Sequence, residues 1–153
     1  MLRILTYGLA GAALVFLSIT VHLAITAFLP FPFSQINILF LLLVILILFG
    51  WRHFALALSL VLHLVLELFS AAEFGSIFLP SAVAMLAMIW LSETVFTNKS
   101  FIAALALGGL GLILYRGLYL LFVVFTNTGP AFSLQGYRAP IAAEILLTTL
   151  AIG

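Results

Sequence analysis

The sequence has no cysteine and no aspartate, and charged side chains make up only 6% of its 153 residues. The lack of cysteine excludes disulfides, thiolate metal sites and lipidated cysteines, and leaves the redox compartment undetermined. The net charge is +1, and the sequence has no cluster of basic residues of the kind that binds nucleic acid. We therefore expect no nucleic-acid partner. With 67% hydrophobic residues against roughly half in a globular chain, the protein has too much apolar surface for a soluble domain.

Catalytic signatures are also missing from the sequence. It holds no HExxH zinc motif, no glycine-rich phosphate loop and no nucleophile elbow. The segment HLVLE offers at most two metal ligands, His63 and Glu67, which is fewer than a metal site needs. We therefore expect a non-enzymatic protein with no cofactor and no metal. An intramembrane enzyme is the less favoured alternative, because no pair of nucleophile and base is evident.

Apolar runs divide the chain into six helical segments, because proline, glycine and polar clusters end each run. The predicted spans cover about residues 4–29, 36–49, 54–69, 77–96, 101–125 and 141–153. The first run is too long for a signal peptide and long enough to cross a bilayer. The last run is short, so it is either re-entrant or incomplete. The sequence predicts an all-α integral membrane protein, one bundle of about six helices in a lipid bilayer.

Basic residues predict the orientation of the bundle, because short cytoplasmic loops carry more Lys and Arg than external loops. If the N-terminus is cytoplasmic, Arg3, Arg52 and Lys99 lie on the cytoplasmic side and only Arg138 lies outside. An even number of spans then returns the C-terminus to the cytoplasm. We therefore predict a multi-pass protein with both termini inside.

Reporter fusions test this orientation. A reporter fused after Ser34, between the first two spans, should lie outside the cytoplasm. A reporter fused after Asn98, between the fourth and fifth spans, should lie inside. An enzyme reporter that is active on only one side of the membrane distinguishes the two. The reverse pattern of activity would contradict the orientation.

Ionisable groups within membrane spans are expensive, so each is a candidate for function. Ser59, His63 and Glu67 recur every four residues in the third span and therefore share one helix face. We expect this face to be buried between helices rather than turned to lipid. It is either a proton relay or ligand site, or a seam of hydrogen bonds between helices.

Arg116 is the only basic residue well inside a predicted span, and its guanidinium stays protonated, so it needs an acidic partner. The rise per residue places Glu67 and Arg116 at similar depth, and we predict that they form an ion pair or share a hydrogen-bonded network. Glu144 is the alternative partner, because it enters the sixth span at a similar level. The predicted polar network comprises His22, Ser59, His63, Glu67, Arg116 and Glu144.

Small residues predict close approach between helices, because a missing side chain lets two backbones come together. The glycines concerned are Gly8, Gly11, Gly108, Gly109 and Gly111. Tyr115 and Tyr119 lie four residues apart on the fifth span and form either a packing face or a binding face.

The segment LELFSAAEFG at residues 66–75 resembles the signature of the rod-shape-determining MreD family. That family carries an acidic residue near the end of its third helix, a serine three positions on and a glycine eight positions on. Here these are Glu67, Ser70 and Gly75. The family usually has aspartate in place of Glu67 and often glycine in place of Ala71. The resemblance extends to about Phe125 and includes chain size and the short second span.

The resemblance implies a non-enzymatic scaffold of the bacterial cell-elongation machinery, which controls peptidoglycan synthesis and cell shape. It implies a place in the bacterial cytoplasmic membrane and partners such as MreC-like proteins and cell-wall synthases. The family is also similar in fold to the substrate-binding S components of energy-coupling-factor transporters. A small-molecule-binding membrane subunit is therefore the alternative function, and the polar stripe is compatible with either.

Overall fold

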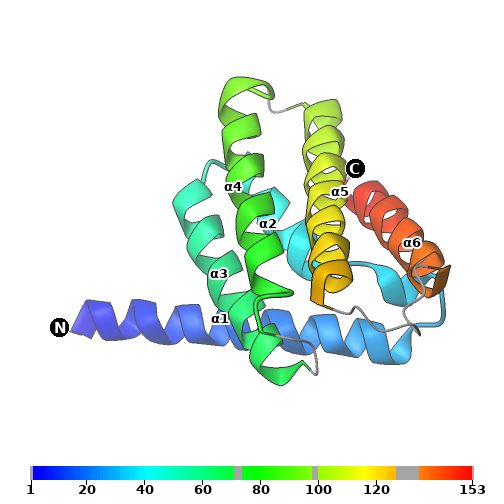
Figure 1. Ribbon diagram of the computed structural model, residues 1–153. Coiled ribbons are helices and arrows are strands. Elements are labelled where there is room, and N and C mark those ends of the chain that lie inside the picture. The colour runs from blue at the N-terminus through cyan, green and yellow to red at the C-terminus, as the bar shows by residue number, and fades with distance from the viewer. Residues whose placement is uncertain (1, 71–73, 98–99, 127–134, 153) are drawn as a thin grey trace.

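The computed structural model describes residues 2–70, 74–97, 100–126 and 135–152, with side chains described from residue 11 onward and, in the last segment, from residue 139. The described residues form six α-helices and one short 3-10 helix (Figure 1). These are α1 (Leu2–Phe28), η1 (Phe33–Gln35), α2 (Ile38–Leu48), α3 (Arg52–Phe69), α4 (Phe78–Thr94), α5 (Phe101–Thr126) and α6 (Gln135–Ile152). The predicted all-α bundle of six helices is confirmed.

Three of the helices are long and apolar enough to cross a membrane: α1 over Gly11–Phe28, α3, and α5. The apolar helices α2 and α4, and the apolar part of α6 at Ala139–Ile152, are shorter. The sixth helix begins at Gln135 rather than near residue 141, because it continues through Pro140 instead of starting after it. A proline this close to the start of a helix removes only one internal hydrogen bond. The short apolar length predicted for this helix is confirmed.

The short helix α2 lies at the centre of the bundle and contacts each of the other five α-helices. Its sequence ILFLLLVILIL is apolar on every side, which is typical of a helix surrounded by protein. Its buried residues are Leu39, Phe40, Leu43, Val44 and Ile47. The apolar core is therefore built around α2, to which α3, α4 and α5 contribute Leu62, Met88 and Leu112 among others.

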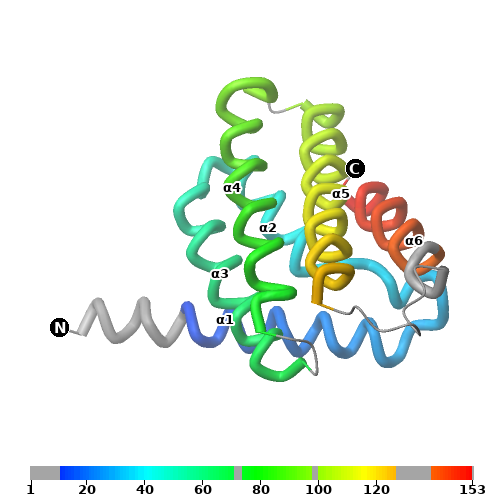
Figure 2. The backbone as a smooth tube through the Cα atoms, viewed as in Figure 1, coloured from blue at the N-terminus to red at the C-terminus, as the bar shows by residue number. Residues whose placement is uncertain are grey.

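The remaining helices are arranged in two directions (Figure 1). Helices α3, α4 and α5 stand side by side, with contacts between α3 and α4 and between α4 and α5, and α6 leans against α5. Helix α1 lies across the lower end of this group instead of alongside it (Figure 2). Its helix contacts are with η1, α2 and α3. Helix α1 therefore does not stand parallel to α3, α4 and α5.

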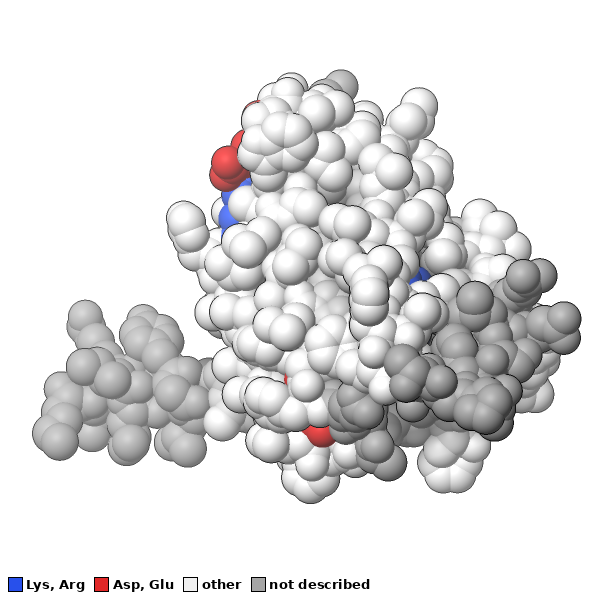
Figure 3. Space-filling model, viewed as in Figure 1, with Lys and Arg blue, Asp and Glu red and all other residues white. Residues whose placement is uncertain are grey.

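The outer surface is almost entirely apolar, and the face drawn in Figure 3 carries charged atoms in only a few small spots. Large hydrophobic side chains that a soluble protein would bury are exposed, including Phe69 at 87% and Phe125 at 74%. Such a surface suits the hydrocarbon interior of a lipid bilayer. Near this surface, Arg52 pairs with Glu93 at 2.7 Å and joins the start of α3 to the end of α4.

Close helix approach is confirmed at two of the predicted glycines. A Cβ at Gly108 would meet the Ile152 side chain of α6, and one at Gly111 would meet Met88 of α4 and lie 3.0 Å from Cζ of Phe40. Gly109 has ordinary contact with Thr149, and Gly11 has no atom within 4 Å of its Cβ position. Gly8 lies outside the residues with described side chains.

Candidate functional site

Glu67 links the end of α3 to the start of α4. Its side chain is buried, and its two carboxylate oxygens accept hydrogen bonds from the backbone N–H groups of Ile77, at 3.0 Å, and Phe78, at 3.1 Å. Helix α4 begins at Phe78, and the first N–H groups of a helix have no partner within it. A carboxylate at this end is also favoured by the helix dipole. Glu67 therefore caps α4 from the preceding helix.

Ser70 and Gly75 belong to the same connection between α3 and α4. The Ser70 hydroxyl donates to the backbone oxygen of Glu67 at 3.0 Å, at the end of α3. Gly75 is buried with φ +95, and a Cβ there would lie 3.2 Å from Cδ1 of Leu79 and 3.5 Å from Cζ of Phe122. Only glycine adopts this backbone conformation without strain. Glu67, Ser70 and Gly75, the three residues of the LELFSAAEFG motif, thus together form the connection between α3 and α4, which we call the joint.

Replacing Glu67 tests the joint. Glu67→Ala should lower the free energy of unfolding by about 2 kcal/mol, because two buried N–H groups lose a charged acceptor. Glu67→Gln, which keeps one acceptor oxygen, should lose about half as much. Unfolding by SDS in mixed micelles measures both. The matched control is Glu93→Ala, since this half-exposed carboxylate should cost less than about 1 kcal/mol. Equal losses for Glu67→Ala and Glu93→Ala would contradict the capping role.

The predicted ion pair between Glu67 and Arg116 is wrong, and the alternative partner is confirmed. Arg116 Nε donates to Oε2 of Glu144, and no other carboxylate lies within ion-pair distance of Arg116 among the described residues. Similar depth did not bring Glu67 close, because its carboxylate is occupied at the start of α4. Helices α5 and α6 contact each other along the bundle, which brings Glu144 to Arg116.

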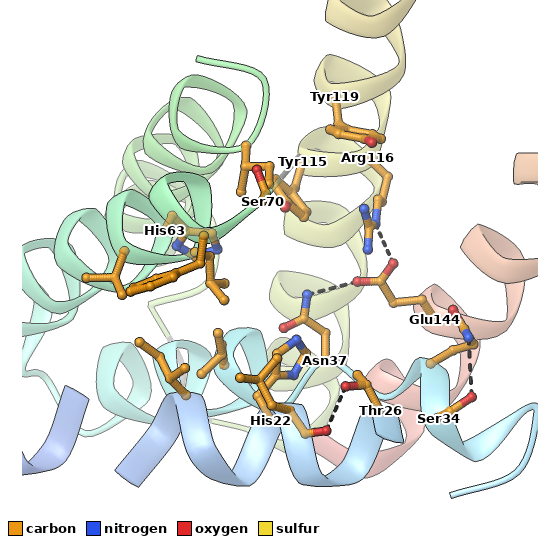
Figure 4. A pocket seen from close by; sticks show the side chains of 18 residues that line it. His22, Thr26, Ser34, Asn37, His63, Ser70, Tyr115, Arg116, Tyr119 and Glu144 are labelled. Carbon is orange, nitrogen blue, oxygen red and sulfur yellow. Dashed lines mark hydrogen bonds and ion pairs between the residues drawn. The ribbon is translucent and has the colours of Figure 1, made fainter. Parts of the chain in front are cut away.

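A buried hydrogen-bond network surrounds this ion pair (Figure 4). Oε1 of Glu144 accepts from the Asn37 amide at 2.8 Å, and the Asn37 backbone N–H donates to the Thr148 hydroxyl at 2.8 Å. The Asn37 side-chain oxygen accepts from the N–H of Phe40 and so caps α2. The network therefore ties α2, α5 and α6 together at one level.

Two members of this network are missing from the sequence prediction. Asn37 stands directly before the apolar run of α2, which is the usual place of a helix N-cap. Thr148 lies four residues after Glu144, on the same helix face. Both signals are present in the sequence, but neither residue is ionisable, so a search for charged groups passes over them.

The Ser59–His63–Glu67 face of α3 is buried as predicted, at 1%, 2% and 3% exposure. The three side chains do not form a continuous chain of hydrogen bonds within the described residues. His63 Nδ1 donates to the backbone oxygen of Ser59 at 2.9 Å, and Glu67 turns instead to α4. The described contacts therefore connect His63 with Ser59 within α3 and connect Glu67 with the start of α4.

The ion pair borders a cavity of about 420 Å³ between α1, η1, α3, α5 and α6 (Figure 4). Its polar lining comes from His22, Thr26, Ser34, Gln35, Asn37, His63, Ser70, Tyr115, Arg116, Tyr119 and Glu144. Its apolar lining comes from Ile19, Leu23, Leu39, Val65, Leu66, Phe69 and Ile77. Four members of the predicted network, His22, His63, Arg116 and Glu144, thus meet at the cavity, whereas Ser59 and Glu67 lie outside its lining.

Several polar groups at the cavity have no protein partner in the described part of the chain. His22 Nδ1 is buried without a hydrogen bond. Arg116 uses only Nε toward Glu144, and its guanidinium carbon lies 5.1 Å from the Tyr115 ring centre and 5.6 Å from that of Tyr119. Tyr115 packs in turn on Phe40 and also lines the cavity, and Tyr119 lines the cavity as well.

Comparison with protein-family models, curated proteins and solved structures finds no match to this chain. The resemblance of residues 66–75 to the MreD signature therefore stays a prediction, whereas the class of multi-span helical membrane protein rests on the fold.

Proposed function

We propose that this chain is a non-enzymatic membrane subunit that binds a small molecule, as the substrate-binding subunit of a transporter does. The observation that carries the proposal is the 420 Å³ cavity at the Arg116–Glu144 pair. Ligand sites in proteins commonly measure about 300–1,000 Å³ and combine apolar walls with a few converging polar groups. This cavity has both kinds of wall, and its size falls in that range.

The unpaired groups at the cavity support the same proposal. A polar atom buried without a partner costs free energy, and such atoms are rare in folded proteins unless water or a ligand satisfies them. His22 Nδ1 on α1 is an atom of this kind. The terminal amino groups of Arg116 on α5 are partly exposed at the cavity and make no hydrogen bond to the described residues. A bound molecule would supply the missing hydrogen bonds.

Blocking the cavity tests this function. Leu23 lines the cavity from α1 and is 54% exposed, so the helix has room for a larger side chain there. The protein is purified from native membranes, and extracted small molecules are identified by mass spectrometry. We expect a compound to accompany the wild type and to be lost, by at least tenfold, from Leu23→Trp.

The matched control is Leu17→Trp, because Leu17 lies on the same helix, is 60% exposed and does not line the cavity. This variant should retain the compound at the wild-type level. Recovery of no compound from the wild type, or equal recovery from both variants, would contradict the binding function.

The second candidate is the scaffold of the bacterial cell-elongation machinery in the cytoplasmic membrane. The observation that favours it is the placement of α1, whose helix contacts among the described residues are with η1, α2 and α3 and which exposes Phe16 at 75% and Leu17 at 60%. A partner helix could cover this face. A photo-crosslinking amino acid at Leu17 should then capture MreC-like proteins or cell-wall synthases in native membranes, whereas crosslinks to lipid alone would count against the scaffold.

A further inference from the structure

We infer that the cavity selects an uncharged molecule that carries a hydrogen-bond acceptor, a hydrogen-bond donor and an apolar body. This inference rests on the proposed binding function and names the class of ligand. It is carried by three observations: the balanced charge of the Arg116–Glu144 pair, the free hydrogen-bonding atoms of the cavity, and the apolar side chains that line the same cavity.

Because the charges of Arg116 and Glu144 balance each other, the cavity favours an uncharged ligand over a charged one. Arg116 and Glu144 are the only Arg, Lys or Glu side chains that line the cavity in the described chain, and each neutralises the other. The Glu144 side chain is 4% exposed and that of Arg116 is 25% exposed, so the pair is largely shielded from water. A charged ligand would leave one unbalanced charge in this low-dielectric site, and such a charge is costly. An uncharged ligand leaves the balance intact.

The free atoms of the cavity define the polar groups of the ligand. The Arg116 terminal amino groups are donors, and among the described residues none of them bonds to a carboxylate, so they call for an acceptor. His63 donates from Nδ1 to the Ser59 backbone oxygen, because a carbonyl only accepts. In the neutral ring this leaves Nε2 as an acceptor, which calls for a donor on the ligand.

The apolar wall defines the rest of the ligand. Ile19 and Leu23 of α1 and Val65, Leu66 and Phe69 of α3 form most of the apolar lining of the cavity. A hydrocarbon or aromatic body placed against this wall is removed from water without leaving polar groups unpaired. A wholly apolar molecule would leave Arg116 and His63 without partners, and a wholly polar one would leave this wall without contacts.

Three probes with the same ring separate charge from shape: benzamide, benzoate and benzylammonium. Benzamide is uncharged and has both an acceptor and a donor, whereas the other two carry one negative or one positive charge. Equilibrium binding of each radiolabelled probe is measured at pH 7.5 on the full chain in lipid nanodiscs, with empty nanodiscs subtracted. We expect saturable binding of benzamide at least tenfold tighter than that of either charged probe, which corresponds to about 1.4 kcal/mol.

Two variants should change this preference in opposite directions. Glu144→Gln leaves the Arg116 charge unbalanced, so benzoate should become the tightest of the three probes by at least tenfold. Arg116→Gln leaves the Glu144 charge unbalanced, so benzylammonium should become the tightest. The matched control is Glu93→Gln, which removes a carboxylate at the far end of α4 and should keep the wild-type order.

The outcomes distinguish this inference from the function on which it rests. Wild-type preference for benzoate or benzylammonium, or an unchanged order in both variants, would overturn the charge-balance argument and leave the binding function standing. Recovery of an anionic or cationic compound in the mass-spectrometric test would do the same. Absence of saturable binding of all three probes, together with no recovered compound, would overturn both.

Discussion

Replacing Arg116 or Glu144 with leucine should lower the free energy of unfolding by about 3–5 kcal/mol in each case, because either change strands a charge in a site shielded from water. Glu144→Leu also leaves the Asn37 amide without its acceptor. The double variant should cost clearly less than the sum of the two single variants, since neither charge is then left unbalanced. Unfolding by SDS in mixed micelles measures all three.

The control for this cycle is the pair of Arg52 and Glu93, whose side chains are 36% and 49% exposed. The same set of single and double leucine variants there should give a coupling energy below about 1 kcal/mol, because water screens an exposed pair. Additive losses at Arg116 and Glu144 would show that the two residues do not act as a pair. A coupling energy no larger than that of Arg52 and Glu93 would lead to the same conclusion.

Gly111→Leu should destabilise the bundle by about 3 kcal/mol, because a side chain there has no space. A Cβ at this position would meet Met88 of α4 and lie 3.0 Å from Cζ of Phe40 of α2. Met88 is a long side chain that can move, but Phe40 is 2% exposed and held in the core. The substitution therefore forces α5 away from the central helix.

Gly117→Leu is the matched control on the same helix. Gly117 has no atom within 4 Å of its Cβ position and faces outward, so leucine there should change the unfolding free energy by no more than about 0.5 kcal/mol. Because both substitutions replace glycine with leucine in α5, their difference isolates the loss of packing from the change in helix propensity. Similar values for the two would contradict the close approach of α5 to α2 and α4.

The six helices are predictable from the sequence, because apolar runs and breakers act locally. The run ILFLLLVILIL is apolar on every side, and this pattern is typical of a helix surrounded by other helices, as α2 is. Burial of Ser59, His63 and Glu67 follows from their spacing on one face of α3. These properties depend on neighbours within a few residues, which a sequence displays directly.

Lateral contacts are not predictable in the same way. Counting residues along each span placed Glu67 and Glu144 at a similar depth in the membrane. Depth does not say which helices are neighbours in the membrane plane. The partners of Glu67 are backbone N–H groups of Ile77 and Phe78, and every residue type except proline offers that donor. The crossing of α1 beneath the bundle likewise depends on contacts with η1, α2 and α3 that no local pattern encodes.

The capping of α4 by Glu67 has a consequence for how the protein enters its membrane. Helix α3 inserted by itself would leave the Glu67 carboxylate in its last turn without the N–H donors at the start of α4, and an ionised group in or near hydrocarbon is costly when it has no partner. The N–H groups of Ile77 and Phe78 that satisfy it come into place only when α4 begins to form. We therefore expect α3 and α4 to enter the bilayer together as a hairpin, because Glu67 in the last turn of α3 is satisfied only by the first N–H groups of α4.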